Sequence, residues 1–272
     1  MRPRKQIVWL TALAATACLA VCGAQAADMK ALRVCADPDN LPFSNRQEQG
    51  FENRIVVLVA EELRIPYAYT WWPQRRGFLR GTLNARQCDV VIGIPTGHPL
   101  VLTTSTYYSS PYVVVSRRRD ALQVASLDDP ILRGLRIGVY QNSPVDFVLG
   151  RRGMVDNVFG YNTFYDGRIN YPEKIIEDVV SGRIDAAIVW GPAAGYFVGQ
   201  RADTLALAPV DVPRLEGQGE GEPEEFAMSM GVRKNDQPLH DLLETVLEAR
   251  SGEIRAILQQ FGVPLDTRGA GN

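Results

Sequence analysis

Apolar residues follow two alternating patterns along this chain. Near-continuous apolar runs at 32–36, 89–94 and 186–190 are typical of strands that are buried on both faces of a sheet. Segments 51–63 and 173–181 instead place their apolar side chains on one face of a helix. Because strands alternate with helices, the pattern predicts an α/β fold with mainly parallel sheets.

Two segments, 83–95 and 180–192, repeat one order of features. Each reads as the end of a helix, a turn, an aspartate (Asp89 or Asp185), a buried strand and a loop that contains proline. Chance similarity between two α/β units is one explanation. The other is that the chain forms two lobes of like construction, each of which presents a loop to a shared cleft.

Segment 67–78 joins a predicted strand to a predicted helix and concentrates aromatic and basic residues. The strand pattern ends after Trp72, because Pro73 cannot continue a sheet ladder. Arg75 and Arg76 follow at the junction, where open α/β folds bind their ligands. Indoles stack and guanidiniums bind carboxylates, so the segment predicts one wall of a cleft. The alternative is one core tryptophan beside solvated arginines.

The first 26 residues have the pattern of a secretory signal. Three basic residues precede an apolar run at 7–21, and Ala24-Gln25-Ala26 supplies a small-residue cleavage site. The run is shorter than the ~20 residues that a membrane-spanning helix needs. The sequence therefore predicts a signal peptide at 1–26, a periplasmic location and no membrane anchor.

Composition is that of an ordinary globular protein, with 46% hydrophobic and 22% charged residues. The 272 residues suffice for one large or two small domains. Loss of the signal, which holds three basic and no acidic residues, leaves 26 basic against 31 acidic residues. This balance does not resemble a nucleic-acid footprint.

Two of the four cysteines, Cys35 and Cys88, lie in the predicted mature chain. An even pair in an oxidising compartment favours a disulfide. The chain-entropy model gives such a bond, across a loop of this length, about 4 kcal/mol.

Enzyme signals are poor. His98 and His240 are the only histidines, and no metal-ligand cluster, nucleophile motif or phosphate loop is present. We therefore expect no catalytic residue, no metal and no cofactor.

Five segments together resemble one family. They are 33–45, 50–54, 69–78, 88–93 and 190–197. In this order they are similar to the type 2 periplasmic binding proteins, and within them to the J proteins encoded beside periplasmic quinoprotein methanol and alcohol dehydrogenases. The resemblance extends over nearly all of 32–265.

The resemblance implies two lobes joined by two crossings. The expected bounds are 27–114 with 229–265 for lobe one, 115–228 for lobe two, 266–272 for a flexible tail, and 113–118 and 226–233 for the crossings. It also implies a partner, either a quinoprotein dehydrogenase or an ABC permease, and a small anionic ligand such as pyrroloquinoline quinone (PQQ).

One departure from the family pattern concerns the loop 95–100. Amino-acid-binding relatives carry a Thr-x-x-Arg motif there, whose arginine holds the ligand carboxylate, whereas this loop contains Thr96 but no arginine. Glu52 occupies the position where those binders place an aspartate against an ammonium group; the alternative is a carboxylate that favours its helix dipole. Cyclohexadienyl dehydratases share the fold, and in such an enzyme Glu52 or Asp37 would be the acid.

The residues expected at the interlobe cleft are Asp37, Asn40, Phe43, Glu52, Trp72, Arg75, Arg76, Thr96, Tyr140, Trp190 and Tyr196. Trp72 and the two arginines are expected to face Trp190 and Tyr196 across it. Such a cleft suits an anionic aromatic ligand and a protein loop equally well. Three hypotheses remain at this stage. The first is a periplasmic accessory protein that docks on a quinoprotein dehydrogenase through the interlobe cleft and assists its maturation or activity. The others are a receptor of an ABC transporter for PQQ or another anionic ligand, and a dehydratase.

Overall fold

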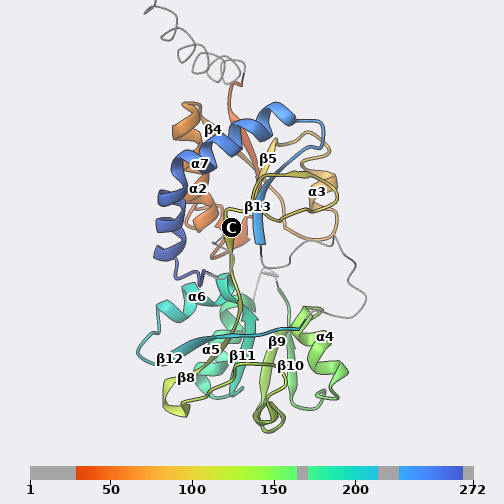
Figure 1. The fold of residues 1–272 in the computed structure, drawn as a ribbon, viewed down its shortest axis with the longest axis vertical. Helices are drawn as coiled ribbons and strands as arrows, with labels where there is room; N and C mark the ends of the chain where they lie inside the picture. The colour runs from red at the N-terminus through yellow and green to blue at the C-terminus, as the bar shows by residue number, and fades with distance from the viewer. Residues whose placement is uncertain (1–28, 164–170, 214–226, 266–272) are drawn as a thin grey trace, which may run out of the picture.

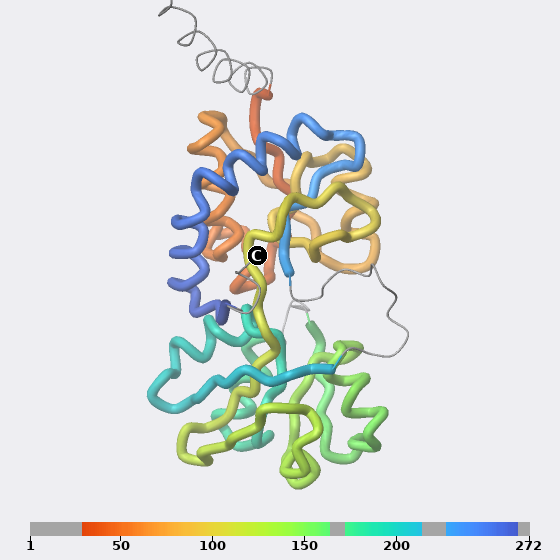
Figure 2. Tube along the Cα trace, viewed as in Figure 1, coloured from red at the N-terminus to blue at the C-terminus, as the bar shows by residue number. Residues whose placement is uncertain are grey.

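The structure is a computed structural model that describes residues 29–163, 171–213 and 227–265. These residues form two lobes, each built around its own sheet, which lie one above the other in Figures 1 and 2. The expected two-lobed α/β fold is confirmed. The predicted signal peptide and tail lie outside the described residues.

Lobe one contains a six-stranded sheet within the described residues. Its order is β4 (Tyr67–Trp71), β1 (Leu32–Ala36), β5 (Val90–Pro95), β13 (Ala227–Val232) and β6 (Leu102–Thr103), and β7 (Tyr108–Ser109) also pairs with β13. The first three strands are parallel, while β13 runs antiparallel to β5. A short hairpin of β2 (Asp39–Asn40) and β3 (Ser44–Asn45) follows β1.

Alternate residues of β5 explain how helices cover both faces of this sheet. Val90 and Ile92 pack in the core that contains α2 (Phe51–Leu63) and α7 (Gln237–Gln260), whereas Val91 packs beside α3 (Phe78–Gly81) on the other face. Figure 1 shows α2 and α7 together on one side of the sheet and α3 on the other. A strand covered on both faces has the near-continuous apolar sequence seen here.

Lobe two contains a five-stranded sheet in the part of the chain that is described. Its order is β10 (Val158–Tyr161), β9 (Ile137–Tyr140), β11 (Ala186–Trp190), β8 (Tyr112–Arg117) and β12 (Leu205–Val210). One core includes residues of α4 (Pro144–Arg151), and the other includes residues of α5 (Tyr171–Ser181) and α6 (Gly191–Gly199). The 3₁₀ helices η1 (Arg118–Asp120) and η2 (Pro130–Gly134) lie in the connections.

The crossings between the lobes differ from the expected positions. β7 ends at Ser109 in the first sheet and β8 begins at Tyr112 in the second, so the chain crosses at 110–111 and not at 113–118. β13 is paired with β5 in the first sheet, so the return crossing precedes Ala227. The lobe bounds shift accordingly. A β-rich segment is recognisable from its own sequence, but the sheet that accepts it is set by distant residues.

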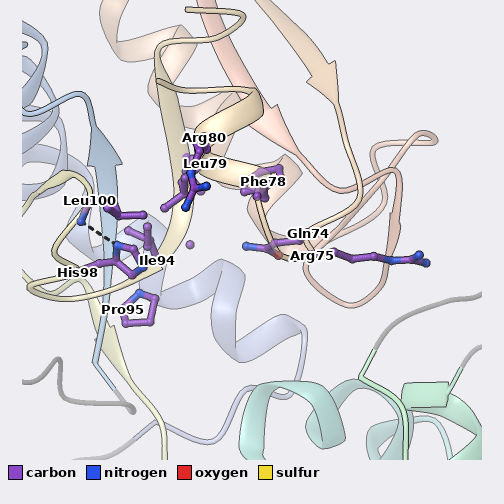
Figure 3. Close-up of a pocket in the computed structure, with 12 residues that line it drawn as sticks. Gln74, Arg75, Phe78, Leu79, Arg80, Ile94, Pro95, His98 and Leu100 are labelled. Carbon is purple, nitrogen blue, oxygen red and sulfur yellow. Dashed lines mark hydrogen bonds between the residues drawn. The ribbon is translucent and has the colours of Figure 1, made fainter. Parts of the chain in front are cut away.

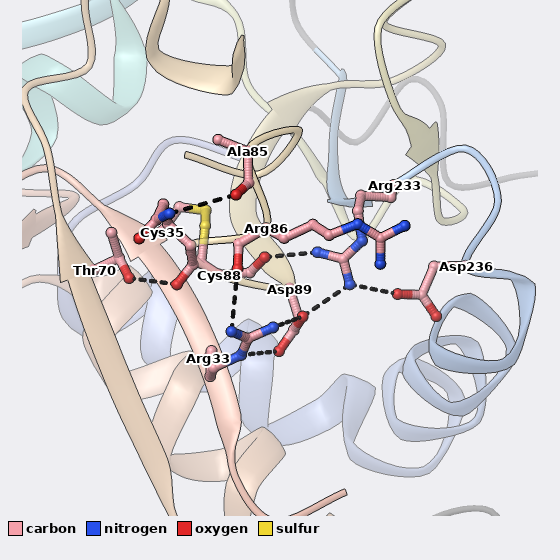
Figure 4. A network of polar contacts seen from close by, with 10 residues as sticks. Arg33, Cys35, Thr70, Ala85, Arg86, Cys88, Asp89, Arg233 and Asp236 are labelled. Atoms are coloured by element: carbon pink, nitrogen blue, oxygen red, sulfur yellow. Dashed lines mark hydrogen bonds and ion pairs between the residues drawn. A yellow bond between two sulfur atoms is a disulfide. The ribbon is translucent and has the colours of Figure 1, made fainter. Parts of the chain in front are cut away.

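A disulfide and a polar network join three strands at the amino end of the lobe-one sheet (Figure 4). Cys35 on β1 is bonded to Cys88 just before β5, which confirms the predicted pair. Asp89 binds Arg33 through two hydrogen bonds of 2.7 and 2.6 Å, and it accepts a third, of 2.8 Å, from Arg233. Arg233 also donates to the carbonyl of Cys88 at 2.6 Å.

Candidate functional site

The candidate site lies where the carboxyl ends of β1, β5 and β11 meet between the lobes. Ligands of open α/β sheets bind at such strand ends. β1 leads into Asp37, β5 ends at Pro95, and β11 ends at Trp190 of lobe two. The site therefore takes residues from both lobes.

Three aromatic rings, which we call the aromatic cluster, join the two lobes. Trp190 stacks on Phe43 with ring centroids 5.8 Å apart and on Tyr108 at 6.3 Å. Its indole Nε1 donates to the carbonyl of Ser110 at 3.0 Å, which fixes the ring at the crossing. Phe43 and Trp190 were both expected in the cleft, and the structure brings them together.

A second contact between the lobes lies at the end of α7. Tyr196 on α6 stacks on Phe261 at 5.8 Å. Beside it, the backbones of Gly195 and Gly262 approach so closely that a Cβ on Gly195 would lie 1.9 Å from the carbonyl oxygen of Gly262. Only glycine permits this approach. Tyr196 therefore faces the C-terminal segment and not Trp72.

Glu52 stands in the first turn of α2, against a notch in β5. A Cβ on Gly93 would lie 2.0 Å from Glu52 Oε1, so the carboxyl group occupies the space that a side chain at 93 would fill. Burial, together with the nearby charge of Asp37, raises the pKa of Glu52 to about 8. Glu52 is therefore largely protonated at neutral pH, which favours neither the ammonium contact nor the helix-dipole role.

Two tyrosines, Tyr108 on β7 and Tyr107 just before it, lie near enough to Glu52 for its charge to affect their pKa. Tyr107 donates its hydroxyl to the carbonyl of Ile92 at 3.1 Å. The Tyr108 hydroxyl is buried and has no hydrogen-bond partner. Burial is the main cause that raises the pKa of both phenols well above the ordinary value, and the Glu52 charge adds to it. The surroundings of Glu52 therefore disfavour negative charge.

Asp37 and Asn40 hold loops in place. Asp37 accepts hydrogen bonds from the backbone N–H of Asp39 at 2.9 Å and of Gln74 at 2.5 Å. Asn40 donates to the Gln74 side chain at 3.3 Å. These contacts tie the loop after β1 to the loop after β4.

The segment after β4 was expected to form one wall of the cleft, and the structure shows its tryptophans in two different surroundings. Trp71, at the end of β4, stacks on Tyr69 at 4.3 Å, while Trp72 lies against Gly81 and is 49% exposed. Arg75 and Arg76 are exposed as well. Trp71 is half-buried, so neither tryptophan of this segment is a core residue.

Thr96 and Tyr140, both expected at the cleft, are held within their own lobes. The Thr96 hydroxyl lies 2.8 Å from that of Thr106 and 2.7 Å from that of Ser229, so it joins its loop to β13. Tyr140 is buried in lobe two, and its hydroxyl has no partner. Burial raises the pKa of Tyr140 far above the ordinary value.

Comparison with known proteins identifies relatives of this chain. No family model matches it. The protein MoxJ of Methylorubrum extorquens is 32% identical over 97% of this chain and 96% of its own length. MoxJ of Paracoccus denitrificans is 29% identical over 93% and 95%. The chain belongs to the MoxJ family.

Two crystal structures share the fold of this MoxJ-family protein. The periplasmic binding protein XoxJ from Methylobacterium extorquens AM1 is 34% identical, has a TM-score of 0.70, and covers 87% of this chain and 100% of its own. MxaJ from Methlophaga aminisulfidivorans MPT is 29% identical, has a TM-score of 0.76, and covers 86% and 100%. The expected type 2 periplasmic-binding-protein fold and branch are confirmed.

Sequence reasoning missed a cavity of about 340 Å³ in lobe one of this MoxJ-family protein (Figure 3). The cavity lies between α3, the segment before it and the loop after β5, and Arg80 and His98 help to line it. The sequence reasoning also missed the roles of Tyr108 and Gly93. Tyr108 lies in a two-residue strand, which leaves no periodic signal, and Gly93 gains its meaning only from the Glu52 side chain.

Two further observations concern the described residues as a whole. They contain no group of three or more His, Cys, Asp or Glu side chains that could hold a metal ion. None of the helices among them is long and apolar enough to cross a membrane.

Proposed function

We propose that this protein is a periplasmic accessory protein that docks on a PQQ-dependent methanol or alcohol dehydrogenase and assists its maturation or activity. Membership of the MoxJ family supports this proposal, and the main structural observation in its favour is the aromatic cluster. In a binding protein of this fold, the crevice at the strand ends is the place for a small molecule. Here Phe43, Tyr108 and Trp190 fill that place with rings of the protein itself.

The polar groups near the aromatic cluster also argue against a small charged cargo. The loop 95–100 offers no arginine to a carboxylate. Glu52, with a pKa of about 8, is mostly neutral at pH 7 and attracts an ammonium group only weakly. A protein partner needs neither contact, because it is recognised by exposed surface.

The exposed segment after β4 is the surface that we assign to docking. Trp72 is 49% exposed although tryptophan is mostly buried in folded proteins. Arg76, four positions along the chain, is exposed as well. Tryptophan and arginine are the residues that most often carry the binding energy of protein interfaces.

The test is a binding titration of the full mature protein with the purified quinoprotein dehydrogenase of the same periplasm. Trp72→Ala is expected to weaken the complex at least tenfold, which corresponds to about 1.4 kcal/mol. Phe147→Ala is the matched control, because Phe147 is 50% exposed but lies on α4 of lobe two. No complex with the wild type would refute docking. Equal losses in both variants would refute the assigned surface.

A small-molecule receptor of an ABC permease is the second candidate, and the binding-protein fold favours it. This candidate predicts saturable binding of a ligand such as PQQ, which tryptophan fluorescence detects because Trp190 lies in the cleft. The double variant Arg75→Ala with Arg76→Ala is expected to weaken such binding if the ligand carboxylates contact these arginines. PQQ binding without dehydrogenase binding would favour the receptor over the accessory protein.

A dehydratase is the least supported candidate. Its support is Glu52, whose pKa of about 8 would leave a proton available at neutral pH. The ancestral amino-acid-binding protein AncCDT-1, a precursor of cyclohexadienyl dehydratase, shares the fold at 17% identity and a TM-score of 0.62, which concerns the fold alone. We propose that the protein is not an enzyme. Conversion of prephenate or arogenate by the wild type, but not by Glu52→Gln, would overturn this.

Export belongs to the same proposal. Sequencing of the secreted protein is expected to find Ala27 as its first residue, because the predicted cleavage follows Ala26. A mature chain that still begins at Met1 would contradict the signal peptide.

A further inference from the structure

The lobe-one cavity is separate from the aromatic cluster. Of the residues expected at the cleft, only Arg75 is among those that line it, and Figure 3 shows the Arg75 side chain extending away from it. None of Phe43, Tyr108 and Trp190 lines it. The volume of about 340 Å³ lies at the lower end of the range for small-molecule pockets.

Two arginines, Arg75 and Arg80, are among the residues that line this cavity. Arg80 on α3 lies over it beside Leu79 (Figure 3). The described part of the chain gives Arg80 no ion-pair partner. No residue that lines the cavity carries a carboxylate. A guanidinium without a counter-charge at a cavity wall is a site for an anion.

Two neutral donors accompany Arg80. His98 Nδ1 accepts a hydrogen bond from the backbone N–H of Leu100 at 3.3 Å, and burial lowers the pKa of His98. A neutral ring whose Nδ1 accepts carries its hydrogen on Nε2, so that atom is a donor. Gln74 uses its side-chain oxygen to accept from Asn40 at 3.3 Å, which leaves its amide hydrogens for a ligand.

The rest of the wall is apolar. Phe78, Val91 and Ile94 belong to the small core beside α3, and each also lines the cavity. Leu100 stands at its rim with 48% of its surface exposed. A ligand that matches all of these groups has one anionic end and a short apolar body.

We propose that this cavity binds a small organic monocarboxylate, with its carboxylate at Arg80 and its hydrocarbon part against Phe78, Ile94 and Leu100. The cavity adjoins the docking surface, because Gln74, Arg75 and Gly77 line it and Trp72 lies against Gly81 of α3. Trp72 itself does not line the cavity, and the probe is titrated without the dehydrogenase, so the two proposals are tested separately.

The test uses hexanoate as the probe and follows the backbone amide signals of the full mature protein by NMR. Hexanoate is expected to shift signals of 74–80 and 93–100 in a saturable way. 1-Hexanol, which has the same chain without the charge, and inorganic phosphate, which has charge without the chain, are each expected to bind at least tenfold more weakly. No saturable shift, or equal binding of either control compound, would overturn the proposal.

Two variants locate the probe. Arg80→Ala is expected to weaken hexanoate at least tenfold, and Leu100→Asp to weaken it similarly by placing a negative charge at the rim. Both residues are exposed, so the fold is expected to persist. Arg54→Ala, on the exposed side of α2, is the matched control for loss of one positive charge in the same lobe. Equal weakening by Arg54→Ala would show a general charge effect and overturn the site.

Discussion

The two lobes treat the amino ends of their central strands in the same way. In lobe one, Asp89 precedes β5, donates its backbone N–H to the carbonyl of Arg33 at 2.7 Å, and binds the Arg33 side chain twice. On the other side, Arg233 at the end of the antiparallel strand β13 donates to the same carboxylate at 2.8 Å. One aspartate thus joins three strands.

In lobe two, Asp185 before β11 has the same set of contacts. Its backbone N–H donates to the carbonyl of Arg136 at 2.8 Å, and the Arg136 side chain binds its carboxylate at 3.0 and 2.7 Å. Arg117, at the end of the antiparallel strand β8, approaches Asp185 at 3.4 Å. The two aspartates are those of the repeated sequence segments, which favours like construction over chance similarity.

The carboxyl ends of the same strands differ. Lobe one places Glu52 in the notch at Gly93, whereas lobe two ends β11 with Trp190 and passes directly into α6. Lobe one alone adds the bond between Cys35 and Cys88. The shared end therefore stabilises the sheets, and the divergent end carries the site. The predictions below test this division.

Removal of the disulfide is expected to have the largest effect. The Cys35→Ala, Cys88→Ala double variant is expected to lose about 4 kcal/mol of unfolding free energy, because the bond closes a loop across 53 positions in the unfolded chain. Urea denaturation under non-reducing conditions measures the loss. A loss below ~1 kcal/mol would show that the network at Asp89 suffices to hold this edge.

Replacement of either aspartate by asparagine is expected to cost about 2–3 kcal/mol, the range for losing charge-assisted hydrogen bonds. Burial opposes ionisation of Asp89, but the hydrogen bonds from Arg33 and Arg233 outweigh it and lower its pKa. Hydrogen bonds from Arg136 lower the pKa of Asp185 to about 2.

Both carboxylates therefore stabilise the fold above pH ~4, and this contribution is lost as the pH falls through the lowered values. Urea unfolding of Asp89→Asn and Asp185→Asn at pH 7 and pH 3 compares the lobes. Similar losses at pH 7 that shrink at pH 3 are expected. A loss in one lobe alone would break the equivalence of the two clusters.

Local patterns in the sequence were sufficient for much of the fold. Near-continuous apolar runs identified β1, β5 and β11, and the expectation of export identified the two mature-chain cysteines as a disulfide. The crossing at 110–111 was not predictable, because the sequence of β8 identifies a strand but not the sheet that it joins. The partners of β8, which are β11 and β12, lie far along the chain.

The site was predicted only in part for a related reason. Phe43 and Trp190 were both expected in the cleft, and the structure stacks them on one another, with Trp190 at the end of β11. Trp71 and Trp72 are neighbours, and successive side chains of a strand point to opposite faces, so which indole stacks depends on a register that the sequence does not state. Arg80 and His98 meet at one cavity only because α3 folds back over β5.

Glu52 gives a prediction for the divergent end. Its pKa of about 8 exceeds the ordinary value of about 4.3, so between these two pH values the folded state holds more protons than the unfolded state. Raising the pH through this window therefore lowers stability, by at most about 1.4 kcal/mol per pH unit. Glu52→Gln is expected to remove this slope and to be more stable than the wild type at pH 8.

Urea unfolding at pH 5, 6, 7 and 8 measures the slope, with Glu48→Gln as a control carboxylate. Parallel curves for wild type and Glu52→Gln would show that Glu52 ionises normally. The carboxyl ends of the strands in the two lobes would then not differ by a protonated carboxyl group in lobe one.

The smallest expected effect concerns the outer arginine of each cluster. The Arg33 and Arg136 side chains are both 47% exposed, so water and salt screen their ion pairs despite the two hydrogen bonds that each forms. Arg33→Ala and Arg136→Ala are each expected to cost about 1 kcal/mol at low salt and less in 0.5 M NaCl. Double-mutant cycles with Asp89→Asn and Asp185→Asn isolate the pair energies. Because the inner arginines, Arg233 and Arg117, are 13% and 10% exposed, their cycles are expected to give larger energies that salt changes little. If the outer pairs are as strong and as salt-resistant as the inner ones, then the pair energy does not depend on the exposure of the arginine. The stabilising role of this edge would then extend to the surface.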